Sequence, residues 1–172
     1  MKTLKPFGIS LFATLALMAL SCSSDSDGDG GGGGGTPTTT SIKAKVDGTQ
    51  YQTFSISGVS AGVATSTGSG SGRMITITGS NDMGGTTSFT INLIGIDATG
   101  EYEIGPDSDS VLSFMSGVSY DTSDCAGATG TVNITLLNED GIRGTFSFTG
   151  KDDDNCSSSK TVSQGSFQGE FM

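Results

Sequence analysis

Apolar and polar residues alternate through most of the chain after residue 40, and this period-two pattern decides the fold class. The clearest runs are IKAKV at 42–46, TSFTINLIG at 87–95, TVNITLL at 131–137 and GTFSFTG at 144–150. Successive side chains of a β-strand point to opposite faces of the sheet, so each run buries one face and exposes Thr and Ser on the other. No window of helical length carries an apolar stripe. We therefore expect an all-β domain of half-buried antiparallel strands.

Turn-forming residues divide these runs into nine or ten strands. Asp47-Gly48 is typical of a two-residue hairpin, and 97–100 is expected to return Leu93 onto Ile104. The predicted strands are 41–46, 49–57, 60–66, 73–79, 86–95, 101–104, 111–118, 131–138, 142–149 and 161–171. Short connections favour an up-and-down antiparallel meander. It forms either a flattened β-barrel or a two-sheet β-sandwich, and both remain open.

The hairpin between TVNITLL and GTFSFTG has a register that its apolar faces predict. A three-residue turn sets Ile134 opposite Phe146 and Val132 opposite Phe148. A two-residue turn at Asp140-Gly141 would scatter the apolar residues over both faces. We therefore expect the three-residue turn.

Two of the three cysteines come at the open end of this hairpin. Cys125 falls opposite Asn155 in the expected register, one residue from Cys156. Curling of the strand ends would bring the two thiols within bridging distance. We expect a disulfide, because two free thiols are less common in an exported chain.

Five carboxylates flank these cysteines and form the one candidate metal site in the sequence. They are Asp121, Asp124, Asp152, Asp153 and Asp154. Carboxylate oxygens on two adjoining loops are ligands that calcium accepts. The competing interpretation is a pair of solvated acidic loops that keep strand ends soluble. Calcium is the only cofactor that the sequence raises.

The first 21 residues have the features of an export signal. Lys2 and Lys5 precede the uncharged run LFATLALMAL, which is too short to span a bilayer. Cys22, the first cysteine of the chain, follows Ser21 directly. This junction resembles the lipobox of bacterial lipoproteins, in which the cysteine is lipidated. Lipid on Cys22 would leave the other two cysteines as a pair. An ordinary signal peptide ending near a cysteine is the alternative.

A polar segment separates this signal from the first strand. SSDSDGDG, a glycine run and TPTTTS cannot bury apolar surface, so residues 22–40 are expected to form a flexible tether with a mean span of about 24 Å. The acidic tract resembles the surface-export signal of Bacteroidota lipoproteins. It could also be a simple spacer in a periplasmic protein. The expected organisation is a cleaved signal at 1–21, the tether at 22–40 and one domain at 41–172.

Composition excludes several classes of function. The net charge of −10 argues against nucleic-acid binding, which needs Lys and Arg to neutralise phosphates. The chain has no His, which removes Ser-His-Asp and Cys-His catalysis. Glu101 and Glu103 could suggest the carboxylate pair of a glycoside hydrolase, but their alternation around Tyr102 predicts the solvent face of a strand. No catalytic residue is expected.

Four motifs, KVDGTQYQ, GEYEIG, GIRGTFSFTG and QGSFQGEF, resemble a family of small uncharacterised β-rich surface lipoproteins of the Bacteroidota. The resemblance covers most of residues 41–171 and implies no activity. We expect a non-enzymatic binding or structural module, monomeric and lipid-anchored at the outer membrane, with an unknown protein or glycan partner. The alternatives are a carbohydrate-binding accessory protein of a nutrient-uptake system and a hydrolase that uses carboxylates alone.

Overall fold

The computed structural model describes residues 35–172. The predicted signal peptide, Cys22 and most of the predicted tether lie outside the described residues. Within those residues, no helix is long and apolar enough to cross a membrane.

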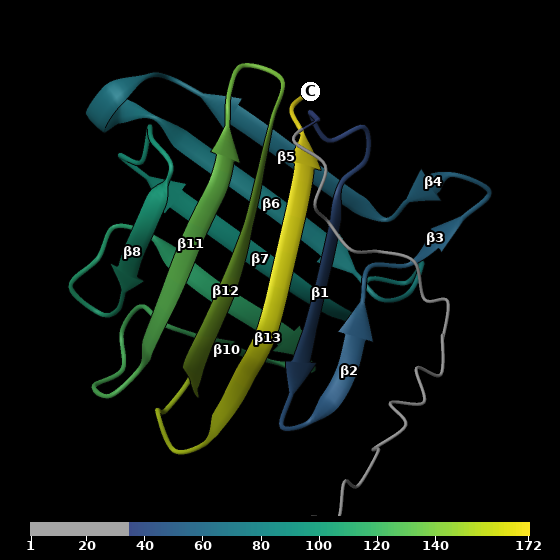
Figure 1. Cartoon of the computed structure of the whole chain (residues 1–172). Helices are drawn as coiled ribbons and strands as arrows, with labels where there is room; N and C mark the ends of the chain where they lie inside the picture. The colour runs from purple at the N-terminus through teal and green to yellow at the C-terminus, as the bar shows by residue number, and fades with distance from the viewer. Residues whose placement is uncertain (1–34) are drawn as a thin grey trace, which may run out of the picture. The chain divides into compact units, whose positions relative to one another are not determined.

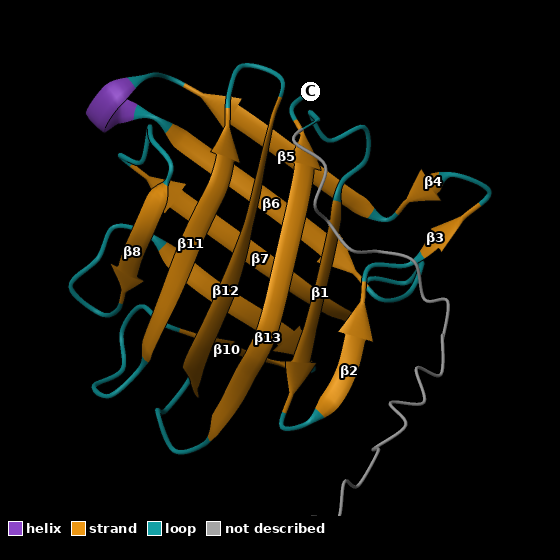
Figure 2. Ribbon diagram, viewed as in Figure 1, coloured by secondary structure: helices purple, strands orange, loops and turns teal. Residues whose placement is uncertain are grey.

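The domain is all-β, as the alternating pattern predicts (Figure 2). Its strands are β1 (Ser41–Val46), β2 (Thr49–Gln52), β3 (Ser55–Ile56), β4 (Val59–Ser60), β5 (Gly62–Thr67), β6 (Met74–Ser80), β7 (Thr87–Ile94), β8 (Gly100–Ile104), β9 (Val111–Ser116), β10 (Val118–Asp121), β11 (Thr129–Leu137), β12 (Gly141–Asp152) and β13 (Ser159–Glu170). A short 3₁₀ turn, η1 (Gly70–Gly72), joins β5 to β6. Three predicted strands are interrupted, at 53–54, at Ala61 and at Gly117, and the others keep their places within a few residues.

The strands form two layers, one behind the other, and the strands of one layer run at an angle to those of the other (Figure 1). The front layer contains β8, β11, β12, β13, β1 and β2, and the back layer contains β10, β9, β7, β6 and β5. One antiparallel sheet runs through both layers, because β12 pairs with β13 along one edge and with both β11 and β10 along the other. The fold is thus a curled sheet, between a sandwich and a flattened barrel.

The strand order departs from a simple meander at β8. The expected return of Leu93 onto Ile104 is wrong, because β7 pairs with β9 and β8 crosses to the front layer to pair with β11. Pairing with β9 sets Phe89 beside Phe114 along a six-residue ladder, longer than β8 offers. Ile104 is buried in its new position, facing the core.

The predicted register of the β11–β12 hairpin is also wrong, by two residues. Val132 lies opposite Phe146, and Ile134 lies opposite Gly144. The turn is tighter than expected because the Asn138 side-chain oxygen accepts the Gly141 N–H at 2.9 Å. A bulge between Ile134 and Leu136 then adds one residue to β11. Turn and bulge together keep Val132, Ile134, Phe146 and Phe148 on the core face.

The core fills the space between the layers, and aromatic rings make up its centre. Tyr51 and Phe89 lie with their ring centroids 5.3 Å and 5.0 Å from that of Phe114. Phe146 contacts Phe89 on one side and Phe167 on the other, at 6.0 Å and 6.2 Å. Such ring pairs add to the free energy gained by burying apolar surface.

The curled sheet closes where β5 meets the end of β13. Ala64 forms an isolated bridge with Phe171, and its side chain is fully buried. A side chain on Gly169 would overlap the Ala64 Cβ, whereas its next neighbours, Ile142 Cγ2 and Thr40 Oγ1, lie at 3.6 and 3.7 Å. Gly169 is therefore the residue that lets the two layers approach at this seam.

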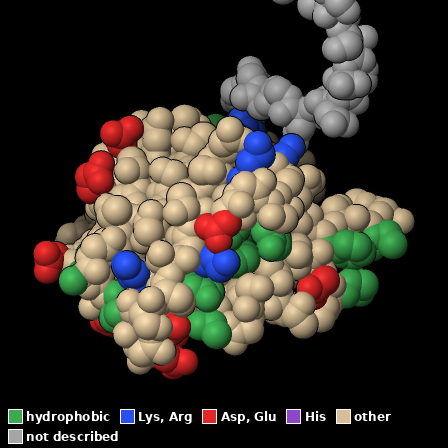
Figure 3. Space-filling model, turned by 90° about the horizontal axis from the view of Figure 1, so that it is seen from below, with side chains coloured by type: hydrophobic (Ala, Val, Ile, Leu, Met, Phe, Trp, Pro, Cys, Tyr) green, Lys and Arg blue, Asp and Glu red, His purple; other side chains and the backbone are tan. Residues whose placement is uncertain are grey.

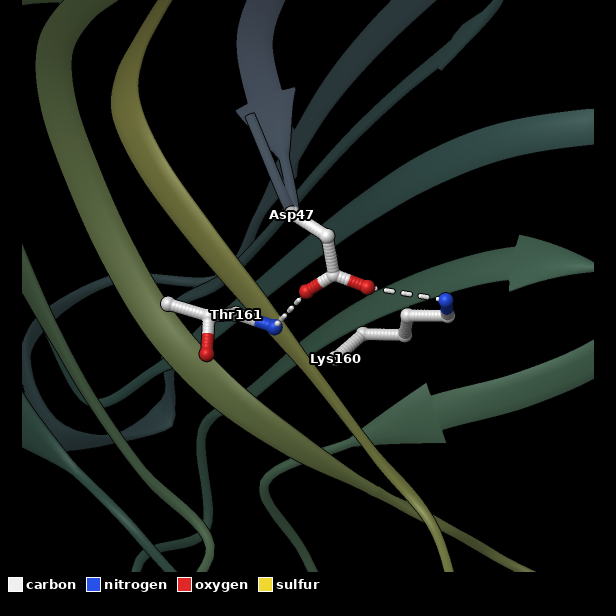
Figure 4. Close-up of polar contacts among 3 residues, drawn as sticks. All are labelled: Asp47, Lys160 and Thr161. Carbon is white, nitrogen blue, oxygen red and sulfur yellow. Dashed lines mark hydrogen bonds and ion pairs between the residues drawn. The ribbon is translucent and has the colours of Figure 1, made fainter. Parts of the chain in front are cut away.

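The β1–β2 turn is fastened to β13 by one carboxylate. Asp47 and Gly48 both have positive φ, 47° and 85°, as a type I′ hairpin requires. The Asp47 carboxylate accepts hydrogen bonds from the Lys160 ammonium group at 2.8 Å and from the Thr161 N–H at 3.0 Å (Figure 4). The Asp47 N–H also donates to the Thr161 carbonyl. The bond from Lys160, with that from Thr161, lowers the pKa of Asp47.

We expect Gly169→Ala to lower the free energy of unfolding by about 1–3 kcal/mol, because the new methyl group must push β5 away from β13. Ala64→Gly in the same chain removes the group that it would strike. The double variant should therefore be more stable than the sum of the two single changes implies, as measured by urea unfolding in a double-mutant cycle. Additive losses would show that the seam is not limited by this contact.

We expect Asp47→Asn to destabilise the domain at pH 7 while keeping the turn, since Asn also tolerates positive φ. The lowered pKa of Asp47 stabilises the fold above the unfolded value of about 3.9. That stabilisation is lost as the pH falls through the folded pKa. The difference in melting temperature between the native chain and the variant should shrink from pH 5 to pH 2. Asp97→Asn, which removes the same charge from an exposed loop, is the control, and a difference that does not vary with pH would contradict the role of the carboxylate.

Candidate functional site: a polar depression on the front layer

The outer face of the front layer is covered by polar side chains aligned in rows across the strands. One row runs through Glu101, Asn133, Thr145, Ser166, Lys43 and Gln52, all exposed. This row thus combines carboxylate, amide, hydroxyl and ammonium groups, with its carboxylate on β8 and its ammonium group on β1.

A shallow, open depression of about 470 Å³ lies on this face, over β8, β11, β12 and β13. Its polar lining consists of Glu101, Thr131, Asn133, Thr145, Ser147, Gln164 and Ser166. Glu103 on the same strand accepts a hydrogen bond from Thr131 at 3.4 Å. Glu101 and Glu103 are exposed, as their alternation predicts.

A β-bulge in β13 underlies the depression. The pairing of β13 with β12 shifts between Phe146 and Phe148, so Ser163 and Gln164 together oppose Ser147. Gln164 takes a positive φ of 52°, and the following Gly165 is buried. Bulges bend a strand and redirect its side chains, which here separates Gln164 from the regular polar rows.

The three tyrosines do not offer an aromatic platform on this face. Tyr51, Tyr102 and Tyr120 are half-buried and pack against the core. The Tyr102 hydroxyl donates to the Ala98 carbonyl at 2.9 Å. Recognition in the depression would therefore rest on hydrogen bonds to hydroxyl, amide and carboxylate groups.

The predicted disulfide is present. Cys125 and Cys156 are bonded, with their Cα atoms 5.6 Å apart. The bridge joins the loop before β11 to the loop between β12 and β13. By the loop-entropy estimate, a crosslink of this span stabilises the fold by about 3–4 kcal/mol.

The structure brings together only part of the predicted calcium cluster. Carboxylate oxygens of Asp152, Asp153 and Asp154 lie within 4.8 Å of one another, and Asp121 and Asp124 are not in this group. Asp121 instead accepts the Ser123 N–H at 3.0 Å and its hydroxyl at 2.7 Å. Figure 3 looks onto this end of the domain, where acidic and basic side chains are interspersed.

Asp152 has a structural role that accounts for its burial. One carboxylate oxygen accepts the Asp154 N–H at 3.0 Å, and the other accepts the Ser158 hydroxyl at 3.3 Å. Its carbonyl accepts the Cys156 N–H at 2.8 Å, beside the disulfide. The residue therefore folds the acidic loop on itself, and calcium binding at this loop stays a prediction.

The depression could not be found from the sequence. Its lining comes from four strands that are far apart in the chain, and β8 joins them only because it crosses to the front layer. The one local signal was Gly165, since glycine within a strand often marks a bulge.

Comparisons with known proteins identify a family but no activity. No curated protein and no solved structure matches the chain. A family model described as a domain of unknown function, DUF6252, matches residues 38–169, which span the whole sheet from before β1 to nearly the end of β13. The chain therefore belongs to the DUF6252 family.

Proposed function

We propose that this protein is an exported, lipid-anchored binding module without enzymatic activity, and that the front-layer depression receives its ligand. Cys22 carries the lipid in this proposal, and residues 22–40 tether the domain to the outer membrane, with the acidic tract directing it to the cell surface. The observation that carries the binding role is the depression itself, a concave and polar site on the outer face of the front layer.

The cysteines support export and anchoring. The chain has three cysteines, and the disulfide uses Cys125 and Cys156. Disulfides persist in oxidising compartments outside the cytoplasm. Cys22 is left over, just after a short apolar run that Lys2 and Lys5 precede. Lipidation gives this remaining cysteine a role.

The chemistry of the depression favours binding over catalysis. Its lining holds one carboxylate, Glu101, whereas glycoside hydrolysis generally requires two that flank the scissile bond. The other polar groups are hydroxyls and amides, which bind ligands through hydrogen bonds. The absence of His from the sequence removes the commonest general base.

A carbohydrate is the second, more specific candidate for the ligand. Sugars present rows of hydroxyl groups, and the depression presents hydroxyl, amide and carboxylate partners along neighbouring strands. Without a stacking aromatic ring, such binding would be weak and would depend on several simultaneous hydrogen bonds. This candidate corresponds to an accessory protein of a nutrient-uptake system.

We expect Cys22→Ala to abolish incorporation of radiolabelled palmitate and to release the protein from the membrane fraction. In the native chain, labelling of intact cells and protease shaving should reach the domain if the acidic tract directs surface display. Protection of the native domain would restrict the proposal to the periplasm. Equal membrane retention of native and variant chains would contradict lipid anchoring.

We expect a glycan array probed with the native full chain to show retention on a limited set of sugars. Thr145→Lys places a long charged side chain in the depression and should reduce that retention by about tenfold. Thr149→Lys, on the same strand and face but outside the depression lining, is the matched control. No retention by the native chain would remove the carbohydrate candidate, and equal loss in both variants would remove the depression as its site.

A further inference from the structure

We propose that the outer face of the back layer binds a second copy of this chain. This face belongs to β5, β6, β7 and β9, which pair in that order. One row across it runs through Val63, Thr78, Thr90 and Ser113, while the intervening side chains of these strands point into the core. It lies opposite the depression, so it offers a second surface beyond the proposed ligand site.

These four strands carry no charge, whereas β10, the fifth strand of the back layer, adds Asp121 directly opposite Ser113 at the margin of the face. None of the four strands contains Asp, Glu, Lys or Arg, whereas charged residues occur in β1, β8, β10, β12 and β13. Surfaces of small soluble domains are commonly about 25–35% charged. The segregation is sharper still in a chain of net charge −10, and loss of charged residues is the compositional mark of the centre of an interface.

Apolar side chains are exposed on the same face. Met74 and Ile94 are direct cross-strand partners and are 49% and 40% exposed. Val63 and Met115, on the two outer strands, are 47% and 40% exposed. Thr76 meanwhile donates a hydrogen bond to Asn92 at 2.9 Å, so part of the polar surface would stay satisfied if water were excluded.

The distribution of charge on the domain favours a second copy of this chain as the partner of this face. Two acidic copies repel one another through most of their surfaces, and the four uncharged strands are where they can meet without bringing like charges together, with Asp121 of β10 left at the margin. Basic residues lie at its edge, as with Arg73, but not on it. A membrane surface would instead favour Lys, Arg and large aromatic residues, which the four strands lack apart from the buried Phe89 and Phe114.

The size of the face predicts a weak, two-fold symmetric dimer. Four strands about 4.8 Å apart and about seven residues long cover roughly 440 Å² of plan area, or about 900 Å² for two copies. That is at the low end for specific interfaces, and it corresponds to reversible association. Two sheets packed face to face keep their strands roughly aligned, which a two-fold axis through the Thr78–Thr90 pair allows.

The test is photo-crosslinking between two differently tagged copies of the full chain, made together in a bacterium that exports it. A benzophenone amino acid replaces Thr78 in one copy. We expect it to join the two tagged copies, with the crosslinked peptide mapping to β5, β6, β7 or β9. The same group in place of Thr149, on the front layer, should give no such product.

Thr90→Lys in both copies should reduce the crosslinked dimer by about tenfold, because the charge must be buried, and Thr149→Lys should not. Circular dichroism checks that both variants fold. If the Thr90→Lys variant does not fold, Ser113→Lys is used in its place. Crosslinks to lipid, to another protein or to residues 1–34 of the same copy would overturn the proposal. So would a Thr78 yield no higher than that of the Thr149 control.

Discussion

Strand β12 is the element on which both layers depend. Along one edge it pairs with β13, and along the other it pairs first with β11 and then with β10. Its inward side chains, Phe146 and Phe148, are buried in the centre of the core. Gly150 lies where the two layers part, and a side chain there would come within 2.8 Å of the Tyr120 backbone. This shared strand joins the two layers, pairs with β13 across the bulge beneath the depression, and leads into the loop that carries Cys156 of the disulfide.

The two outer faces have separated their chemistry. The front layer combines hydroxyl, amide and charged groups in cross-strand rows, while β5, β6, β7 and β9 of the back layer carry mainly hydroxyl and apolar groups and no charge, the carboxylate of Asp121 coming only on the neighbouring β10. Side chains alternate along every strand, so each layer gives one face to the shared core and is free to specialise the other. A further exposed apolar feature, the β3–β4 hairpin with Ile56 and Val59, projects beside the layers (Figure 1). Nothing in the described residues covers it.

Local pattern predicted the elements well and their neighbours only in part. Alternation located the strands, Asp47-Gly48 located its hairpin, and the cysteine count gave the disulfide, because each of these is written in a short stretch or in the composition. The prediction of the β11–β12 register failed because the register depends on hydrogen bonds that the Asn138 side-chain oxygen accepts from the Asp140 and Gly141 N–H groups, and on a bulge, neither of which alternation encodes. The predicted position of β8 was wrong because β9, and not β8, pairs with β7. The depression was missed for the same reason, since its lining exists only after those non-local choices are made.

The pairing of β1 with β13 has a consequence for how this chain is made. Residues 41–46 pair with residues 162–168, so the first strand of the domain can pair fully only after the last strand is available. Pairings between distant parts of a chain form slowly, because the loop between them must be closed first. A ribosome or a translocation channel that delivers the chain from its N-terminus therefore releases a domain unable to close until its final residues emerge. The topology itself delays closure of the domain until β13 has been delivered.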